Sequence, residues 1–298
     1  MSSGKQARRF HRHLKLTGYL FLLPSLVIWL TFQFYPIINT VILGFHRYDL
    51  LTPKKFIGLG NYVDLFHDSI FWQTSMVTLT YVAGTYLPVF VISLSLALAL
   101  KSIGAKKLQG IFRTTFFLPN VVSIVSICVI WKLIFHPSGL SASLTRLFVS
   151  APVAWLHYPR TSQAALIITN IWREFGYFTV LFLAGLLGIP EEYYEAARVD
   201  GASRPRMLFN ITLPLLRRTV VFVIILCVVR GMQTFIPQFI MTRGGPGISN
   251  TPITLSIYHN AFSYYKMGRA SAMAVLLGVV ALAFTFVQLR LFEGEKEK

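Results

Sequence analysis

Long stretches of apolar residues, separated by short polar segments, follow one another along the chain. An α-helix rises about 1.5 Å per residue, so roughly 20 apolar residues can cross the ~30 Å hydrocarbon layer of a bilayer. Six stretches are long enough, and they cover approximately residues 16–45, 71–100, 111–135, 164–187, 219–240 and 268–289. The pattern therefore predicts an all-α polytopic membrane protein with six transmembrane helices.

Composition and charge support a membrane protein and exclude a nucleic-acid-binding one. A soluble chain of 298 residues would form about two domains, but here 54% of residues are hydrophobic and only 13% are charged. The formal net charge of +17 could indicate phosphate binding. The basic residues, however, are grouped at the ends of apolar stretches, which is typical of membrane proteins. We therefore expect a surrounding lipid bilayer and no bound nucleic acid.

The distribution of lysine and arginine predicts the orientation in the membrane. Seventeen of them lie in the amino-terminal segment and in segments 101–113, 189–218 and 290–298, against nine in the alternate connecting segments. Cytoplasmic segments carry the excess of basic residues, so both termini and segment 189–218 are predicted to be cytoplasmic. The predicted organisation is a basic segment 1–15, a transmembrane domain 16–292 that contains the cytoplasmic loop, and a tail 293–298.

Segment 189–218 has more internal order than a simple connection between two helices. Acidic residues follow Pro190 and favour the start of a helix, and Gly201 can adopt the positive φ that ends one. Ser203 can cap a second short helix that lasts until Pro214 begins the next membrane segment. Apolar residues mixed with charges of both signs favour docking into a partner protein. The alternative is an amphipathic loop that lies on anionic lipid.

The spacing of this segment resembles that of a known signature. Glu195-Ala196-Ala197 is followed by three residues, Gly201, nine residues and then Ile211-Thr212-Leu213-Pro214. This is similar to the cytoplasmic loop of the permease subunits of ATP-binding-cassette (ABC) importers.

Further likeness extends over nearly the whole chain and is strongest to carbohydrate importers of the maltose and glycerol-phosphate type. It includes residues 56–62 (FIGLGNY), which look like FxGLxNY, then Trp131, Phe135, Pro137 and Gly139, Gly244-Gly245-Pro246, and Gly268 with residues 270–274. One departure is Val77, which stands where many relatives carry asparagine.

The resemblance implies a type I ABC importer permease fold, six membrane helices and a multi-pass location in a bacterial cytoplasmic (inner) membrane. It implies four interaction partners: a second homologous permease, two copies of an ABC ATPase, an extracytoplasmic solute-binding protein and the lipid bilayer. It also implies that the loop couples the ATPase to the membrane helices. The residues to which this role is assigned are Glu191, Glu195, Ala196, Ala197, Asp200, Gly201, Arg204, Phe209 and Pro214.

The sequence itself offers no site for ATP. Ser3-Gly4-Lys5 lacks the upstream glycine and the following hydroxyl residue of a phosphate-binding loop, so ATP and Mg²⁺ are expected on separate chains. The seven histidines are scattered without metal-ligand spacing, so we predict no metal, catalytic residue or cofactor. A transport subunit is therefore favoured over a membrane enzyme and over a transporter that works without ATP. The closer alternative is a permease of the same superfamily for another class of solute.

Charged residues inside the fourth and fifth apolar stretches are candidates for the solute pathway, because a charge at mid-membrane depth is costly unless it is paired or hydrated. Glu174 and Arg230 could pair and hold two helices together without touching a solute. Alternatively, the residues could line a cavity that recognises the hydroxyl groups of a sugar or oligosaccharide, or an anionic solute such as a glycerol phosphate ester. The predicted pathway residues are Asn170, Arg173, Glu174, Tyr177, Arg230, Gln233 and Thr234.

The family resemblance supports only part of this set. In maltose-type relatives the corresponding stretches contact sugar, and Gln233 and Thr234 fall on polar contact positions. Arg173 and Glu174 replace small or apolar residues there, so the resemblance leaves the identity of the solute open.

Overall fold

The structure, a computed structural model of the chain, describes residues 20–103, 105–145 and 153–293. The predicted basic segment 1–15 and nearly all of the predicted tail 293–298 lie outside the described residues. The chain divides into two compact units. One is formed by residues up to 65 together with 260–275, and the other by residues 66–259 together with those from 276 onwards.

The first unit begins with an apolar helix over Leu20–Gly44. A buried amide fixes the end of this helix, because Asn61 Nδ2 donates hydrogen bonds to the carbonyls of Gly44 and His46, both at 2.9 Å. Two short antiparallel strands follow the helix, with His46 opposite Phe56 in their register. The elements are η1 (a π-helical turn, Leu30–Phe34), α2 (Tyr35–Gly44), β1 (His46–Arg47), β2 (Lys55–Phe56), α3 (Gly60–His67), η4 (His259–Ser263) and the start of α13 (Met267–Glu293).

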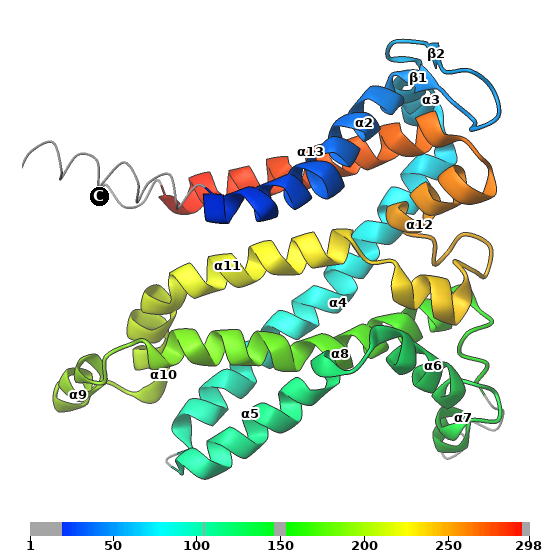
Figure 1. Cartoon of the computed structure of the whole chain (residues 1–298). Coiled ribbons are helices and arrows are strands. Elements are labelled where there is room, and N and C mark those ends of the chain that lie inside the picture. The colour runs from blue at the N-terminus through cyan, green and yellow to red at the C-terminus, as the bar shows by residue number, and fades with distance from the viewer. Residues whose placement is uncertain (1–19, 104, 146–152, 294–298) are drawn as a thin grey trace, which may run out of the picture. The chain divides into compact units, whose positions relative to one another are not determined.

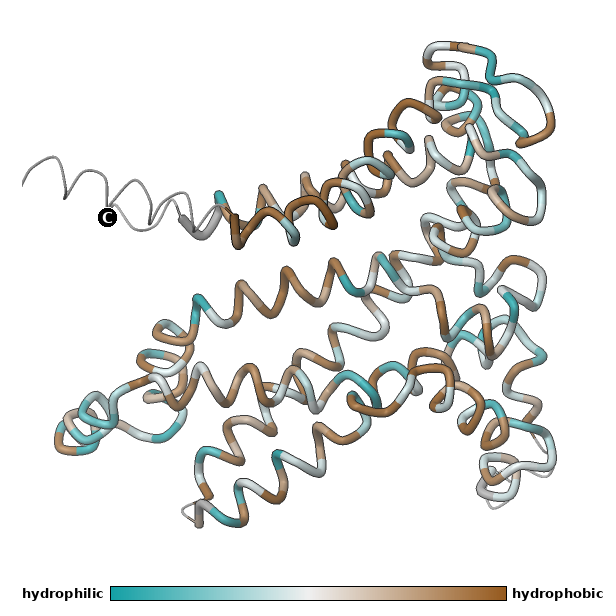
Figure 2. Tube along the Cα trace, viewed as in Figure 1, coloured by the Kyte–Doolittle hydropathy of each residue, from teal (hydrophilic) through white to brown (hydrophobic). Residues whose placement is uncertain are grey.

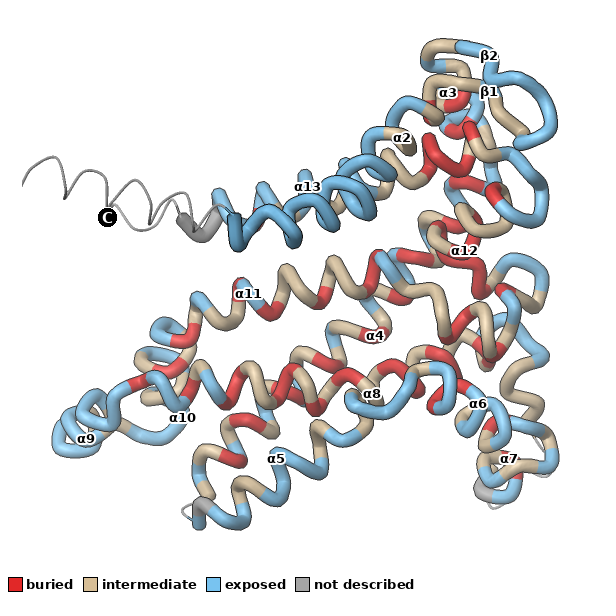
Figure 3. Tube along the Cα trace, viewed as in Figure 1, coloured by how far each residue is buried: buried red, intermediate tan, exposed pale blue. Residues whose placement is uncertain are grey.

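The second unit is a helical bundle with α8 at its centre. Buried residues recur along α8, and this helix packs against α4, α5 and α11 (Figures 1 and 3). The elements are α4 (Ser69–Ser102), α5 (Lys106–Val121), α6 (Ile124–Ile134), α7 (Leu140–Thr145), α8 (Pro159–Leu187), α9 (Glu192–Val199), α10 (Arg204–Met207), η2 (Leu208–Thr212), α11 (Leu213–Met232), η3 (Gln238–Thr242) and α12 (Ile253–Tyr258).

Close backbone approach and aromatic packing hold α8 in this position. A Cβ atom added to Gly176 would overlap the carbonyl oxygen of Phe116 in α5, so glycine is required for these two helices to touch. Towards α4, Ser93 Oγ donates to the carbonyl of Phe175 at 2.8 Å. Phe178 is fully buried in the cluster that α4, α8 and α11 share. The central helix is therefore closely packed against its neighbours.

The third apolar stretch, residues 111–135, was predicted to form one membrane-spanning helix, but the structure divides it into two. It forms α5 and α6, whose axes differ by 91°. Pro119 removes a backbone donor near the end of α5, and Val122 and Ser123 are extended, with ψ of 143° and 127°. Five described helices are long and apolar enough to span a membrane, and the bent pair makes six if it is counted as one span, in agreement with the predicted number.

The fifth apolar stretch differs from the predicted span 219–240 at both ends. Its helix is continuous from Arg204 to Met232, and residues 233–235 are not helical. Helical structure resumes just before Pro237, which cannot donate a backbone hydrogen bond. The backbone therefore breaks inside an apolar stretch, a feature that hydropathy alone does not reveal.

A buried polar cluster holds the loop that follows η3 and contains Gly244-Gly245-Pro246. Asn250 is fully buried, and its Oδ1 accepts a hydrogen bond from the hydroxyl of Tyr81 at 2.5 Å. Its Nδ2 donates to Ser162 Oγ at 2.7 Å and to the carbonyl of Gly245 at 2.6 Å. One side chain thereby connects the loop to α4 and α8.

Candidate functional site

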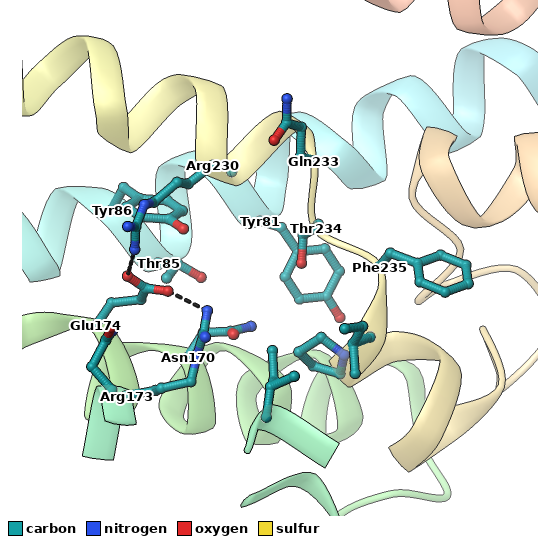
Figure 4. A pocket seen from close by; sticks show the side chains of 15 residues that line it. Tyr81, Thr85, Tyr86, Asn170, Arg173, Glu174, Arg230, Gln233, Thr234 and Phe235 are labelled. Carbon is teal, nitrogen blue, oxygen red and sulfur yellow. Dashed lines mark hydrogen bonds and ion pairs between the residues drawn. The ribbon is translucent and has the colours of Figure 1, made fainter. Parts of the chain in front are cut away.

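The two breaks in the apolar helices lie beside the same cavity. The cavity has a volume of about 510 Å³ and is bounded by α4, α8, the junction of α5 and α6, and the end of α11 (Figure 4). Irregular backbone at membrane depth occurs where protein buries it or where it lines a hydrated cavity. The lining residues are Tyr81, Thr85, Tyr86, Asn120, Ile124, Asn170, Arg173, Glu174, Arg230, Gly231, Gln233, Thr234, Phe235, Ile236 and Pro237.

A charged triad lies on one wall of the cavity. Glu174 is 1% exposed, and its Oε2 accepts a hydrogen bond from Arg230 Nη1 at 2.8 Å. Its other carboxylate oxygen pairs with Arg173 Nη2. The arginine side chains are more accessible, at 22% for Arg173 and 33% for Arg230. The carboxylate is thus enclosed, while both guanidinium groups retain accessible surface. Figure 4 shows the carboxylate of Glu174 between the two guanidinium groups.

Aromatic packing fixes Arg230 in place. Its Cζ lies 4.1 Å from the centroid of the Tyr177 ring and 5.7 Å from that of Phe178. A guanidinium over an aromatic face is attracted by the negative charge of the ring face. The predicted pairing of Glu174 with Arg230 is present, and since both residues also line the cavity, this pairing does not exclude contact with a solute.

The sequence identified six lining residues correctly as neighbours in space, and Tyr177 is the exception. Tyr177 is not among the lining residues and contributes by holding Arg230. Gln233 lies at the cavity, but it is exposed and its amide points away from the triad (Figure 4). Thr234 donates from its hydroxyl to Gln238 Oε1 at 3.0 Å. Proximity is therefore confirmed for six residues, while a role in solute passage stays a prediction.

Several lining residues carry no signal in the sequence that could have singled them out. Tyr81, Thr85 and Tyr86 lie on α4 among other hydroxyl residues, and Asn120 lies inside a stretch that looks like an ordinary span. Phe235 lies in the non-helical segment after α11. Only the packing of four elements selects these residues from their neighbours.

The second candidate site is the polar segment between α8 and α11. It begins with α9 and ends this helix in a Schellman motif, in which the Ala202 N–H donates to the Ala197 carbonyl at 2.9 Å and the Gly201 N–H donates to that of Arg198 at 3.1 Å. Gly201 has a φ of +72°. The predicted helix end at this glycine is confirmed.

The second half of the segment differs from the predicted short helix. Ser203 precedes α10, but its side chain makes no capping hydrogen bond. The helix then passes through the π-helical turn η2 and continues into α11, where the Leu213 N–H donates to the carbonyl of Leu208. This wider turn lets the helix continue past Pro214, which lacks an N–H. The segment is therefore a direct extension of the membrane helix.

The surface of the segment combines exposed apolar and charged side chains. Figures 1 and 2 show α9 and α10 at the end of α8 and α11 that lies away from α6 and α7, with hydrophilic residues over α9. Tyr193, Val199 and Phe209 are 53%, 87% and 65% exposed. Glu191 and Arg198 form an exposed ion pair. Among the other residues singled out from the sequence, Glu195, Ala196, Asp200, Gly201, Arg204 and Pro214 are exposed and Ala197 is half-buried.

One residue of α9 connects the segment to two membrane helices. The hydroxyl of Tyr194 lies 3.1 Å from Thr212 Oγ1 in η2, and Lys101 Nζ, at the end of α4, lies 4.1 Å from the centroid of the Tyr194 ring. The sequence analysis missed both Lys101 and Tyr194, because their contact joins residues far apart in the chain. Tyr194 therefore contacts both the end of α4 and the turn that leads into α11.

Comparisons with known proteins agree with these features. The family described as "Binding-protein-dependent transport system inner membrane component" matches residues 71–294. The chain is 33% identical to the probable ABC transporter permease protein YurN of Bacillus subtilis, over 95% of this chain and 98% of that protein. It is also 33% identical to the trehalose/maltose transport system permease protein MalF of Thermococcus litoralis, over 97% and 98% of the two chains.

A solved structure has the same fold. It is a chain of a bacterial ABC transporter involved in the import of the acidic polysaccharide alginate, with a TM-score of 0.82, 25% sequence identity and coverage of 96% of this chain and 98% of that chain. The helix content, the family match and this likeness together identify a type I ABC importer permease fold. The chain therefore belongs to the family of binding-protein-dependent transport system inner membrane components, the permease subunits of ABC importers.

Proposed function

We propose that this chain is a permease subunit of an importer that moves a sugar or oligosaccharide across a bacterial inner membrane. In this proposal a second permease and two ATPase chains complete the membrane complex, and an external binding protein delivers the solute. ATP and Mg²⁺ bind to the ATPase chains. The observation that carries the proposal is the pairing of a polar cavity at membrane depth with an ordered, exposed segment at the end of the same helices.

The segment between α8 and α11 supports the docking of an ATPase. Exposed apolar side chains next to charges are unfavourable in water but suit a protein interface. Glu195 is exposed and has no ion pair with the described residues, so it is free to pair with a basic residue of the ATPase. The Schellman motif at Gly201 and the continuity of η2 with α11 would hold the docked segment in a defined orientation relative to α11.

The route from the ATPase to the cavity follows from the same contacts. Tyr194 links α9 to η2 and to the end of α4. The same α4 lines the cavity further along its length, through Tyr81, Thr85 and Tyr86, and α11 lines it at its other end, through Arg230 and Gly231. In the proposed cycle, closure of the ATPase dimer shifts α9, and α4 and α11 move with it. The cavity would then change its access because its walls belong to these helices.

The chemistry of the cavity supports a carbohydrate. Hydroxyl and amide groups of Thr85, Asn120 and Asn170 can exchange hydrogen bonds with sugar hydroxyls, and Tyr81 and Tyr86 add aromatic surface. The substrates named for the Thermococcus permease and for the solved importer are also saccharides.

The test uses the complete importer in proteoliposomes. Substitution of Gly201 by valine places a β-branched residue at positive φ, at about 1–2 kcal/mol or more of backbone strain, and should uncouple uptake from ATP hydrolysis or release the ATPase. Gly247→Val is the matched control, because Gly247 has a φ of +58° and nothing within 4 Å of its Cβ position, as is true of Gly201. It should retain the ATPase.

Glu195→Lys adds a test of charge, and it should weaken copurification of the ATPase. Normal coupling in both Gly201→Val and Glu195→Lys would refute the role given to the segment. Uptake by this chain alone, driven by an ion gradient without ATPase subunits, would refute the proposed function as a whole.

A further inference from the structure

The charges in the cavity do not balance. Arg173 and Arg230 carry two positive charges, and Glu174 is the only acidic residue among the residues that line the cavity. The ion pairs with Glu174 use one nitrogen of each guanidinium, although each guanidinium has five N–H donors. Arg173 Nε is buried without a hydrogen-bond partner among the described residues. One positive charge and several donors therefore remain uncompensated.

The rest of the membrane part of this chain cannot supply the missing negative charge. Along the sequence, Glu174 is the only acidic residue between Asp68 and Glu191, and none occurs between Asp200 and Glu293. An excess charge at membrane depth is costly unless an opposite charge or water meets it. Water in the cavity can solvate part of this excess charge, and an anion from outside the chain would neutralise it.

We propose that the solute carries an anionic group such as a carboxylate, and that Arg173 and Arg230 bind this group while the neutral polar residues of the cavity bind its hydroxyls. This inference rests on the proposed function and narrows it to acidic saccharides. A planar guanidinium matches a carboxylate, sulfate or phosphate in geometry as well as in charge.

The geometry suits transient binding of such a group. Glu174 is enclosed, so a solute meets the partly exposed arginines and not the carboxylate. Arg230 is held over Tyr177, and Arg173 is held by Glu174, so little side-chain ordering remains to be done when an anion binds. Because Glu174 already offsets one of the two positive charges, the attraction is moderate, as transport requires release of the solute on the other side.

The experiment measures binding of two probes to the purified membrane complex in lipid nanodiscs. The probes are the disaccharide digalacturonate and its dimethyl ester, in which both carboxylates are converted to uncharged esters on the same sugar units. The wild-type complex should bind the acid at least about tenfold more tightly than the ester, as expected for charge-assisted hydrogen bonds. In Arg173→Gln the ratio should fall towards one. Glu174 keeps Arg230 as its partner in that variant, so the carboxylate is not left alone.

Arg160→Gln is the matched control, because Arg160 is an exposed arginine of the same helix that does not line the cavity. It should leave the ratio unchanged, and Arg173→Lys should retain part of the preference. Equal binding of both probes to the wild type, or binding of neither, would overturn the inference. So would an equal loss of both probes in Arg173→Gln, since that result would give Arg173 a structural role that does not depend on the charge of the solute.

A separate measurement distinguishes a failure of this inference from a failure of the proposed function. The complete wild-type importer is assayed for ATP-dependent uptake of neutral maltotriose and of the acidic probe. Uptake of maltotriose without preference for the acidic probe would support the carbohydrate importer and refute only the proposal that the solute is acidic. Uptake of neither neutral nor acidic saccharides would refute the proposed function itself.

Discussion

Removal of the Glu174 carboxylate is the most informative single perturbation of this protein. Glu174→Gln keeps the size of the side chain and one acceptor oxygen, but it takes away the negative charge that both arginines share. Glu174 is 1% exposed and pairs with Arg173 and with Arg230, the latter at 2.8 Å. The substitution therefore leaves two guanidinium groups close together with no carboxylate between them.

The size of the effect follows from these contacts. Each hydrogen bond to a charged group contributes about 1.5–3 kcal/mol, and glutamine can keep one of the two in weaker form. Breaking a fully buried pair costs about 3–5 kcal/mol, but the arginines are 22% and 33% exposed, so water in the cavity can solvate part of the freed charge. We therefore expect the complex to lose about 2–3 kcal/mol of stability.

The assay is thermal unfolding of the purified complex in detergent, followed by intrinsic fluorescence, for wild type, each single variant and the double variant Arg173→Gln/Glu174→Gln. The double variant should be more stable than the sum of the single effects, because loss of Arg173 removes the repulsion that loss of Glu174 creates. Glu192→Gln, an exposed acid on α9, serves as the control and should shift stability by no more than about 0.5 kcal/mol. Wild-type stability of Glu174→Gln, or strict additivity in the double variant, would refute this account of the triad.

Three further substitutions test the packing around the site. Gly176→Leu should abolish assembly of a folded complex, because its side chain would overlap a backbone carbonyl of α5; normal expression and size-exclusion behaviour would contradict this. Tyr81→Phe should cost about 1–3 kcal/mol in thermal unfolding, because Asn250 loses a buried donor; an unchanged melting temperature would show that this hydrogen bond is dispensable. Lys101→Met should lower uptake per ATP hydrolysed about two- to fivefold, because the cation over Tyr194 contributes about 0.5–1 kcal/mol; unchanged coupling would remove this contact from the proposed route.

Local features of the fold were predictable from the sequence. Hydrophobic length depends only on composition over about 20 residues, so the number of membrane segments agrees with the pattern. The bounds of α4 and α8, which form the second and fourth apolar stretches, agree with it to within about five residues. The end of α9, at Val199 just before Gly201, was also predictable, because a positive φ is a property of the residue and its immediate neighbours.

The sequence alone determined that the chain crosses a membrane, that an ordered polar segment separates its fourth and fifth apolar stretches, and that three charged residues lie deep within them. Only the tertiary structure decided where the third and fifth stretches break, that Glu174 lies between Arg173 and Arg230, and that Tyr81, Thr85 and Asn120 share their cavity. Hydropathy averages over a window and carries no information on backbone direction, whereas the breaks depend on a few residues. The contacts of the cavity arise between helices distant in sequence, whose relative rotation is set by close packing such as that of Gly176 against α5.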